Sequence, residues 1–285
     1  MQMNAIIMAA GTSSRFVPLS YEIPKGLLEV KGEVLIERQI RQLNEAGIYD
    51  IVVVVGYMAD KFVYLKEKLG VQIVYNEDYN KYNNTSSLIR VIDQLDNTYI
   101  CSSDNYLLDN VFQGRPTDSY YSALYVEGDT GEYCLTTDSN DNIVEVKIGG
   151  SDAWYMVGHV FFNREFSAKF REIMKKEYDC EETRQGYWED VYIRYINELP
   201  LMKIHRYQPH MIEEFDTLDE LRKFDKSYVD DTRSSVIKGI CNEMKWKESE
   251  LGRFRKAADS HAFFFSVGDN NYTYDVNIVP HIRVI

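Results

Sequence analysis

The first hundred residues alternate between short apolar segments and amphipathic segments, and this alternation constrains the fold more than any other feature. Residues 4–9 (NAIIMA) and 50–57 (DIVVVVGY) are apolar, and the second is rich in valine, which is typical of strands buried in a parallel sheet. Between them, residues 34–47 carry apolar side chains at helical spacing and end at Gly47. A strand, a helix and a strand in this order predict a βαβ unit, and hence an α/β protein with a mostly parallel sheet.

The same alternation continues to residue 104. The expected elements are a helix over about 58–70, a strand over 71–76, a helix over about 86–95 and a strand over 98–103. In sheets of this kind, ligands bind beyond the carboxyl ends of the strands. Gly11, Gly56 and Asp104 each follow such a strand end. The sequence therefore predicts a binding site at this edge of the sheet.

The pattern changes between about residues 119 and 163. Aromatic and β-branched segments alternate there with turns rich in Asp, Asn and Gly, which is typical of antiparallel strands. We expect four of them, over residues 120–128, 132–137, 142–148 and 154–163, as a layer that covers one side of the cleft. Helices are expected next, over about 164–178, 187–198 and 217–224.

A domain boundary is predicted at residue 232. Residues 233–285 have 8 Lys and Arg against 6 Asp and Glu, and so a charge of +2, whereas the whole chain has −13. They are predicted to hold one helix (234–246) and one hairpin (261–276), a small α+β appendage to a main domain over 1–232. Because a helix and two strands bury too little apolar surface to fold alone, we expect the appendage to pack on the main domain or on a second copy, as in a homodimer.

Composition excludes several classes of function. A net charge of −13 does not suit a broad surface for nucleic acid or anionic membrane, although a few local cations or a divalent metal can hold a small anion. The chain begins without the basic segment of a signal peptide, and no apolar run approaches the length of a membrane-spanning helix. The four cysteines are scattered, as is typical of reduced structural thiols. We therefore expect a cytoplasmic protein that binds neither nucleic acid nor membrane.

The segment after the first strand, MAAGTSSRFVPLSYEIPKGLL (8–28), carries the first candidate site. Gly11 lets the backbone approach a ligand, and successive N–H groups in such a turn bind anions. Arg15 can pair with phosphate oxygens in a forked geometry, while Pro24 stiffens the backbone before Lys25. The segment matches neither a Walker loop nor the G-x-G-x-x-G fingerprint. A surface loop with two solvated cations is the alternative.

Two further polar clusters follow strand ends. Asn83, Thr85, Ser86 and Ser87 lie just before an apolar helix. Their side chains can cap that helix, or they can offer donors and acceptors to the edge of a nucleobase. Asp104 follows the next strand, and a carboxylate there can hold Mg²⁺ against phosphate oxygens. An Asx turn that closes the strand is the alternative for Asp104.

The residues AAG…SR…P…PK, within residues 9–25, resemble the nucleotide-binding signature of nucleotidyltransferases that use nucleoside triphosphates. More narrowly, residues 56–88, 103–107 (SDNYL) and 186–192 (GYWEDVY) are similar to segments of bacterial CTP:phosphocholine cytidylyltransferases. The resemblance covers about residues 2–225. It implies a GT-A-like, Rossmann-type fold, with CTP and a small phosphorylated amino-alcohol as partners and Mg²⁺ as cofactor.

The resemblance also implies a role for each matching residue. Those that contact the nucleotide, the first three through their backbone, would be Ala9, Ala10, Gly11, Asn83 and Ser87. Arg15 would bind the triphosphate, and Lys25 the region of the α-phosphate. The wider family often has a second glycine where this sequence has Ser13, which leaves slightly less room for the phosphates.

The implied reaction is attack of an acceptor phosphate oxygen on the α-phosphorus of CTP. Because both reactants are anions, the enzyme has chiefly to neutralise and align them. By the same resemblance Asp104 is a Mg²⁺ ligand together with Glu189 or Asp190, of which we favour Asp190. His159 lies among apolar strand residues, so we expect a buried or cleft-wall histidine and not a catalytic one.

The acceptor pocket is predicted from aromatic residues. A quaternary ammonium donates no hydrogen bond, and proteins recognise it with aromatic faces and a nearby carboxylate. The candidates are Tyr133, Trp154, Tyr187 and Trp188, with Glu132 or Asp190 for the charge. Packing of the antiparallel strands is the alternative role of each ring. The resembled family has Trp at the position of Tyr133, and a primary ammonium would also fit such a pocket.

Residues 234–276 resemble the opening helix and first hairpin of a choline kinase-like domain, a kind of domain found fused behind such cytidylyltransferases. The catalytic loop and metal-binding motifs of a kinase do not follow, so we expect a remnant or a truncated copy. The sequence thus predicts transfer of CMP from CTP to phosphocholine, with 2-aminoethylphosphonate or phosphoethanolamine as alternative acceptors. A non-catalytic, nucleotide-binding regulatory protein is the second alternative, which the intact Arg15, Lys25 and Asp104 disfavour.

Overall fold

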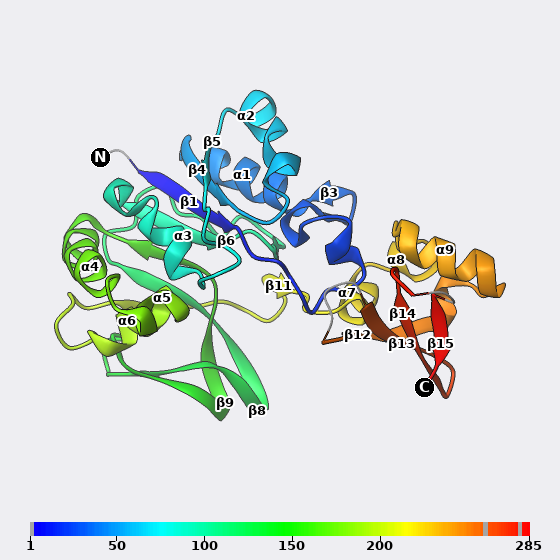
Figure 1. The fold of residues 1–285 in the computed structure, drawn as a ribbon. Coiled ribbons are helices and arrows are strands. Elements are labelled where there is room, and N and C mark those ends of the chain that lie inside the picture. Colours follow the sequence, from blue (N-terminus) through cyan, green and yellow to red (C-terminus); the bar gives the residue numbers. More distant parts are fainter. Residues whose placement is uncertain (1–2, 259–261, 279–280) are drawn as a thin grey trace. The chain divides into compact units, whose positions relative to one another are not determined.

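The structure is a computed structural model that describes residues 3–258, 262–278 and 281–285. The chain forms two compact units. The first, which we call the sheet unit, comprises Met1–Gly11 and Leu35–Glu214. The second, the loop–tail unit, comprises Thr12–Val34 and Phe215–Ile285, so that it joins a blue segment to yellow and red ones in Figure 1.

A seven-stranded sheet in the order β10-β8-β9-β6-β1-β4-β5 forms the centre of the sheet unit. Its strands are β1 (Asn4–Ala9), β4 (Asp50–Val55), β5 (Gln72–Tyr75), β6 (Thr98–Ser102), β8 (Tyr120–Thr137), β9 (Ile143–Phe162) and β10 (Lys203–Arg206). β1 pairs in parallel with β4 and β6, β4 with β5, and β10 with β8, whereas β9 is antiparallel to both neighbours. The expected α/β fold with a mostly parallel sheet is confirmed.

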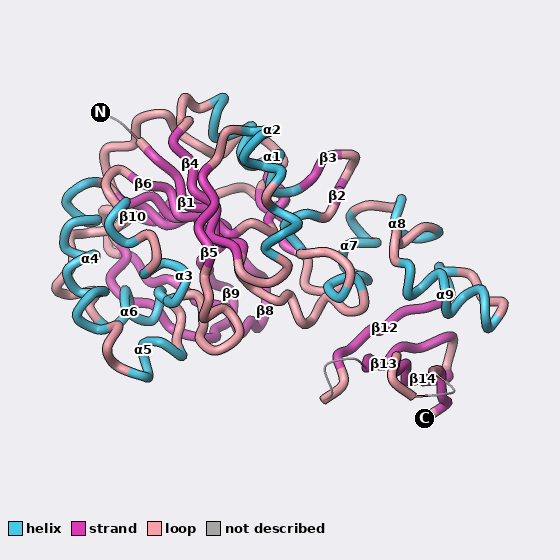
Figure 2. Tube along the Cα trace, turned by 45° about the horizontal axis from the view of Figure 1, so that its top comes forward, coloured by secondary structure: helices cyan, strands magenta, loops and turns pink. Residues whose placement is uncertain are grey.

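Helices cover both faces of this sheet (Figure 2). They are α1 (Leu35–Glu45), α2 (Tyr64–Leu69), α3 (Thr85–Ile89), α4 (Arg164–Glu177), α5 (Glu181–Gln185) and α6 (Trp188–Arg194). Leu88 of α3, Phe170 of α4 and Val191 of α6 pack in one core with Ile6 and Val52 of the sheet. The right-handed crossovers through α1 and α2 place these two helices on the other face. Within the described ranges, no helix is long and apolar enough to cross a membrane.

The antiparallel part of the sheet differs from the expectation. The four strands expected between residues 120 and 163 are two long ones, β8 and β9, and both belong to the main sheet. Their register shifts in several places, as between Val126 and Asp129. Gly128 and Gly149 have φ angles of 80° and 79°, which glycine adopts without strain. The strands therefore bend at these glycines and continue, where the sequence pattern indicates that they end.

Several short elements also differ from the expectation. The helix expected over 58–70 is a 3₁₀ turn (Ala59–Phe62) followed by α2, and the helix expected over 86–95 is α3 followed by a 3₁₀ turn (Ile92–Gln94). The helix expected over 187–198 is the shorter α6. β7 (Asn105–Leu107) and β11 (Ile212–Glu214), which pair with each other, have no counterpart in the expectation. Strands of three residues are too short to carry a periodic signal.

The loop–tail unit contains the segment after β1 and the appendage. Its strands are β2 (Glu29–Val30), β3 (Glu33–Val34), β12 (Leu251–Lys256), β13 (Ala262–Val267), β14 (Asn270–Asp275) and β15 (Ile282–Val284). Its helices are α7 (Leu218–Phe224), α8 (Ser227–Asp230) and α9 (Ser235–Met244), with 3₁₀ turns at Leu19–Tyr21, Lys25–Leu27 and Glu248–Glu250. β12 to β15 form a four-stranded antiparallel sheet, so the expected hairpin β13–β14 has a further strand on each side. The first residue of that hairpin, His261, lies outside the described residues.

The compact units have other bounds than the predicted division at residue 232. One reason is Arg222 of α7, whose guanidinium donates to the backbone carbonyls of Tyr228, Leu251 and Glu248. A buried arginine that satisfies three carbonyls ties α7 to the appendage. The division of the sequence into 1–232 and 233–285, and the kinase-like origin of the second part, stay predictions.

Candidate active site

Three strands of the sheet unit end side by side, as expected for parallel strands. Ala9, at the end of β1, lies opposite Val55 of β4, and Met8 lies opposite Ser102 of β6. The turns that follow the three strands are therefore neighbours. Gly11 is exposed in the first of these turns. This edge is the one at which the sequence predicts a binding site.

The turn after β1 is held by the turn after β4. The Tyr57 N–H donates to the Ala10 carbonyl at 3.1 Å. Gly56 is required for this close approach, because a Cβ at its position would lie 2.5 Å from Cβ of Tyr79 and 3.0 Å from Cβ of Ala10. The backbone of Ala10 is thus fixed at the edge of the sheet, as a turn that receives a ligand needs to be.

The hydroxyl residues at the start of α3 are buried and bonded to their surroundings. Asn76, which follows β5, is fully buried and donates to Oγ of Ser86 at 2.8 Å and to Oγ of Ser87 at 2.9 Å. The Thr85 hydroxyl donates to two backbone carbonyls around the end of α5. The N-cap residue of α3 makes no side-chain hydrogen bond to the first turn. These hydroxyls therefore do not cap the helix. Asn83, the other predicted cytosine contact, keeps partial exposure.

Asp104 lies in the turn between β6 and β7 and is partly exposed. The ladder between β7 and β11 places Glu214 opposite Asn105, directly beside this turn. A second carboxylate residue is therefore a neighbour of Asp104, although it is far away in the sequence. The acidic run EEFD (213–216) is the sequence signal that points to it.

The described side chains at this edge of the sheet do not by themselves form a complete metal site. In the part of the chain that the structure describes, no group of three or more His, Cys, Asp or Glu side chains is arranged to hold a metal ion. Mg²⁺ usually takes one or two carboxylates and completes its shell with water and substrate phosphates. Asp104 is the carboxylate that the sequence predicts for such a site, and Glu214 follows it across the β7–β11 ladder.

Glu189, in the first turn of α6, is held between two side chains. Asn84 Nδ2 donates to one carboxylate oxygen at 3.1 Å, and the Tyr121 hydroxyl donates to the other at 3.2 Å. Burial raises the pKa of the Glu189 carboxyl from 4.5 to about 7, and the hydrogen bonds offset part of this rise. Near neutral pH the group therefore exists in both charge states. A cation bound nearby would favour the ionised one.

Asp190 joins two aromatic rings at the start of α6. Its Oδ2 accepts the Tyr187 N–H at 2.8 Å, which caps the helix, and its Oδ1 accepts the Tyr133 hydroxyl at 2.9 Å. The rings of Tyr133 and Tyr187 meet edge to face with centroids 6.5 Å apart. Tyr187 is 47% exposed, and Glu132 beside Tyr133 is exposed as well. The structure thus brings together two of the four predicted acceptor rings and one of the two predicted carboxylates, Asp190.

The two tryptophans among the acceptor candidates lie apart from this pair. Trp188 is 3% exposed, stacks on Tyr121 with centroids 6.0 Å apart and meets two phenylalanines edge to face. Trp154 lies edge-on to Tyr125 at 5.4 Å, with the Arg206 guanidinium 5.4 Å from its ring centroid. The structure therefore gives Trp188 the packing role that the sequence left open.

His159 is buried, as expected. It is 2% exposed and lies among the rings of Tyr99, Phe112, Tyr120 and Tyr207. Burial lowers the pKa of the imidazole to about 3, so the ring is neutral at physiological pH. The residue belongs to an aromatic core, which is consistent with a structural histidine.

In the loop–tail unit, the two cations of the predicted phosphate loop share one carboxylate. Nη1 of Arg15 lies 2.7 Å from Oδ2 of Asp216, and Nζ of Lys25 lies 3.8 Å from Oδ1. The Lys25 side chain is 5% exposed and that of Arg15 is 74% exposed, so the solvated-cation alternative is wrong for Lys25. Ser13 has a φ of 48°, in the left-handed region that favours glycine, which explains the glycine of the wider family. Asp216 is not among the residues predicted from the sequence. The acidic run EEFD (213–216) is the sequence feature that points to it.

Comparison with known proteins finds nucleotidyltransferases. The family model for MobA-like NTP transferase domains matches residues 5–113. A 2-aminoethylphosphonate cytidylyltransferase of Lancefieldella rimae is 38% identical over 230 residues, which covers 79% of this chain and 93% of that protein. A choline-phosphate cytidylyltransferase of Streptococcus pneumoniae is 34% identical over 224 residues, which covers 79% of this chain and 97% of that protein.

Solved structures show the same fold. The CTP:phosphocholine cytidylyltransferase from Streptococcus pneumoniae superposes with a TM-score of 0.77 at 34% identity, and the match covers 80% of this chain and 99% of that one. About a fifth of this chain therefore has no counterpart there. A putative glucose-1-phosphate thymidylyltransferase from Bacillus anthracis superposes with a TM-score of 0.64 at 18% identity, and so shares the fold. The Rossmann-type nucleotidyltransferase fold implied by the sequence is confirmed.

Proposed function

The chain belongs to the cytidylyltransferases of the nucleotidyltransferase family, and on this premise we propose that it transfers CMP from CTP to phosphocholine, releasing pyrophosphate and forming CDP-choline. The observation that carries the choice of acceptor is the cluster of Tyr133, Tyr187 and Asp190 at the start of α6. Aromatic faces beside a carboxylate are the surroundings that a quaternary ammonium prefers.

The ring faces of this cluster favour a quaternary ammonium over a primary one. Each carboxylate oxygen of Asp190 already accepts one hydrogen bond, from Tyr187 or from Tyr133. Both oxygens of Glu189 are engaged in the same way. A primary ammonium has three N–H donors to satisfy, whereas a trimethylammonium has none and needs only charge and ring faces. The half-exposed ring of Tyr187 beside the Asp190 carboxylate suits the second.

A second acceptor is supported by a specific finding. The relative from Lancefieldella rimae, at 38% identity, is a 2-aminoethylphosphonate cytidylyltransferase. Carboxylate oxygens have further lone pairs, so Asp190 and Glu189 can accept from a primary ammonium in addition to their present donors. CMP transfer to 2-aminoethylphosphonate is therefore the alternative activity of the same site, with phosphoethanolamine as a third acceptor of this kind.

The roles of the charged residues follow from their chemistry. Arg15 and Lys25 would bind the triphosphate of CTP, and the buried position of Lys25 strengthens its interaction with phosphate by excluding water. Asp104 would hold Mg²⁺, and we place Glu214 beside it as the second carboxylate because of the β7–β11 ladder. Bound Mg²⁺ would neutralise phosphate charge and align the reactants. Asp190, favoured by the sequence for this role, is engaged by Tyr187 and Tyr133 and suits the acceptor better.

The nucleoside contacts stay predictions. They comprise the backbone of Ala9, Ala10 and Gly11 and the side chains of Asn83 and Ser87. The hydroxyl of Ser87 accepts from Asn76, which leaves its own proton to donate to an acceptor atom of the base. A cytoplasmic location and a homodimer also stay predictions.

Pyrophosphate release tests the proposal. The full chain with CTP and Mg²⁺ is supplied with phosphocholine, phosphoethanolamine or 2-aminoethylphosphonate in parallel. We expect the highest kcat/KM with phosphocholine, and a preference for 2-aminoethylphosphonate would make the alternative correct. Release with none of the three would support the non-catalytic regulatory protein instead.

Two variants test the roles of single residues in the same assay. Lys25→Ala and Asp104→Asn should abolish turnover while the far-UV circular dichroism spectrum stays that of the wild type. Lys176→Ala, which removes an exposed lysine of α4, is the matched control and should keep full activity. Activity near that of the wild type in Lys25→Ala or Asp104→Asn would remove the mechanism.

A further inference from the structure

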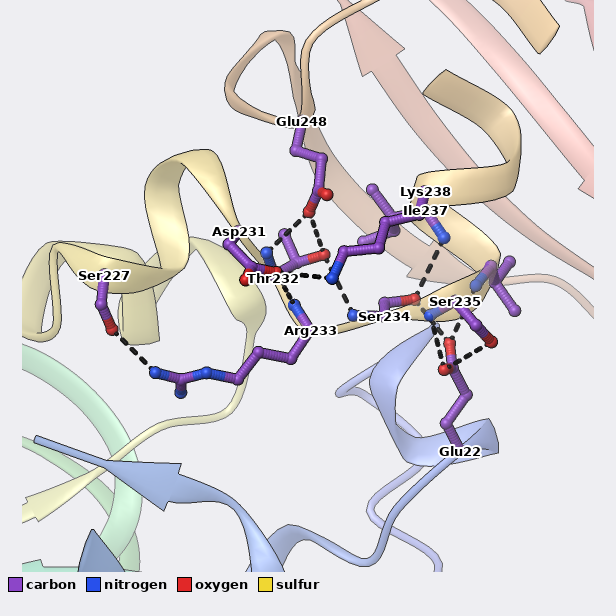
Figure 3. A network of polar contacts seen from close by, with 11 residues as sticks. Glu22, Ser227, Asp231, Thr232, Arg233, Ser234, Ser235, Ile237, Lys238 and Glu248 are labelled. Carbon is purple, nitrogen blue, oxygen red and sulfur yellow. Dashed lines mark hydrogen bonds and ion pairs between the residues drawn. The ribbon is translucent and has the colours of Figure 1, made fainter. Parts of the chain in front are cut away.

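The appendage is bonded to the segment that carries both predicted phosphate-binding cations. The link is Glu22, which lies between Arg15 and Lys25 in the sequence. Its carboxylate accepts four hydrogen bonds from the start of α9 (Figure 3). The donors are the hydroxyls of Ser234 and Ser235 at 2.5 and 2.8 Å and the N–H groups of Ser235 and Val236 at 2.7 and 3.1 Å.

This contact satisfies a need of the helix. The first N–H groups of a helix have no partner within it, and its positive end favours a carboxylate. Within α9, the Ser234 hydroxyl accepts the Ile237 N–H, which leaves the N–H groups of Ser235 and Val236 to Glu22. Hydrogen bonds to an ionised acceptor are about twice as strong as neutral ones. Glu22 is therefore an anchor with several charge-assisted bonds, and not an incidental surface contact.

Contacts on both sides of Lys25 reinforce this anchor. Before it, the Tyr21 hydroxyl donates to the Ala262 carbonyl at 3.1 Å. After it, the Glu29 carbonyl accepts from the Tyr228 hydroxyl at 2.8 Å and from Nη1 of Arg233 at 2.8 Å. The segment from residue 21 to 29 is thus fixed at both ends by residues of the appendage and of α8. Lys25 lies in the middle of this fixed segment.

We propose that the appendage positions the phosphate-binding segment, with Glu22 as the positioning residue through which α9 acts on Lys25. This inference rests on the proposed function, since it assigns to the appendage a part in binding CTP. It gives a role to a segment that the sequence describes only as a remnant or truncated copy of a kinase-like domain. The match to the pneumococcal structure covers 80% of this chain.

The experiment compares Glu22→Gln with Glu248→Gln in the full chain. Glu22→Gln keeps the size of the side chain and removes the charge that holds α9. Glu248→Gln is matched, because Glu248 also accepts two hydrogen bonds, from the N–H and hydroxyl of Thr232 at 2.6 and 2.5 Å, but lies within the appendage. Pyrophosphate release then gives KM for CTP, KM for phosphocholine and kcat for each variant.

We expect Glu22→Gln to raise KM for CTP about tenfold, which corresponds to about 1.4 kcal/mol, and to leave KM for phosphocholine within twofold of the wild type. Glu248→Gln should leave both values within twofold. Equal effects of the two variants would mean that general stability of the appendage is responsible, and no effect of Glu22→Gln would mean that the anchor has no role in CTP binding. Either outcome overturns the proposal.

Ser235→Ala alone keeps the test valid if Glu22→Gln folds poorly, and a double-mutant cycle extends the test when both variants fold. Ser235→Ala removes one donor from the opposite side of the same contact and should raise KM for CTP about threefold, about 0.65 kcal/mol. Combined with Glu22→Gln, it should add less than its single effect, because both changes act on one interaction. Fully additive effects would contradict the anchor. If the wild-type chain releases no pyrophosphate from CTP with any of the three acceptors, the proposed function is wrong. Failure of the proposed function is therefore distinguishable from failure of the proposed anchor.

Discussion

Replacement of Glu189 by Gln tests the electrostatics beside the predicted acceptor pocket. Burial raises the pKa of this carboxyl from 4.5 to about 7, so between these pH values the folded protein holds a proton that the unfolded chain has released. A proton bound only by the folded state makes folding less favourable as the pH rises. The contribution of Glu189 to stability is therefore fully present below pH 4.5 and is lost as the pH rises to about 7.

The size of the effect follows from the width of this interval. One pKa unit corresponds to about 1.36 kcal/mol, so the free energy of unfolding of the wild type should fall by about 2.5 kcal/mol relative to Glu189→Gln between pH 5 and pH 8. The side chain keeps partial contact with solvent, which makes this an upper value. Because the difference between the two proteins is measured, contributions of other titrating groups cancel.

Urea denaturation followed by tryptophan fluorescence measures this difference. The chain has three tryptophans, of which Trp154 and Trp188 lie in the sheet unit and Trp246 packs on Tyr272 in the loop–tail unit. A Trp246→Phe background therefore makes the signal report on the sheet unit alone. A difference between wild type and Glu189→Gln that is the same at pH 5 and pH 8 would refute the reasoning.

The remaining predictions concern three other residues. Because burial lowers the pKa of His159 to about 3, the free energy of unfolding of the wild type should fall as the pH falls below 6.5. Denaturation at pH 4.5 and pH 7 measures this fall, and His159→Phe should lack it. Trp188→Ala should lower the free energy of unfolding by about 3–5 kcal/mol in thermal unfolding, because the ring fills the core, and a smaller loss would argue for a site at its face. Tyr187→Leu should raise KM for phosphocholine about two- to tenfold and leave KM for CTP unchanged, and an unchanged phosphocholine KM would remove the ring pair from the acceptor site.

The parallel half of the sheet was predictable because burial on both faces leaves a strong signal. The strand expected over 4–9 is β1 (Asn4–Ala9), and the helix expected over 34–47 contains α1 (Leu35–Glu45). The antiparallel half of the sheet was less predictable, because a glycine with positive φ occurs both in turns and in bulges. Gly128 and Gly149 look like turn residues in the sequence, and only the pairing of β8 with β9 shows that the strands continue past them.

The candidate site likewise contains residues that the local sequence predicts and residues that it does not. Residues within ordered motifs, such as Lys25, Asp104 and Asp190, are predicted from local sequence because their chemistry and their place after a strand or before a helix coincide. Glu214 and Asp216 are not found, because each gains its importance from a partner far away in the chain. Packing also has no local signal, so Trp188 and Tyr187, adjacent in sequence, are equal candidates until the core around Trp188 is seen.

The segment that carries the two predicted phosphate-binding cations is long, and its length explains why it needs contacts with other parts of the chain. Residues 10–34 connect β1 to α1, whereas such connections usually have about two to six residues, and loops beyond about 15 are uncommon. The segment contains two 3₁₀ turns and the short β2–β3 ladder, which is too little regular structure to fix a lysine for phosphate binding. Asp216 and the start of α9 supply the missing contacts. If the proposed role of Glu22 holds, a change that destabilises α9 should raise KM for CTP in the pyrophosphate-release assay, and an unchanged KM would contradict it.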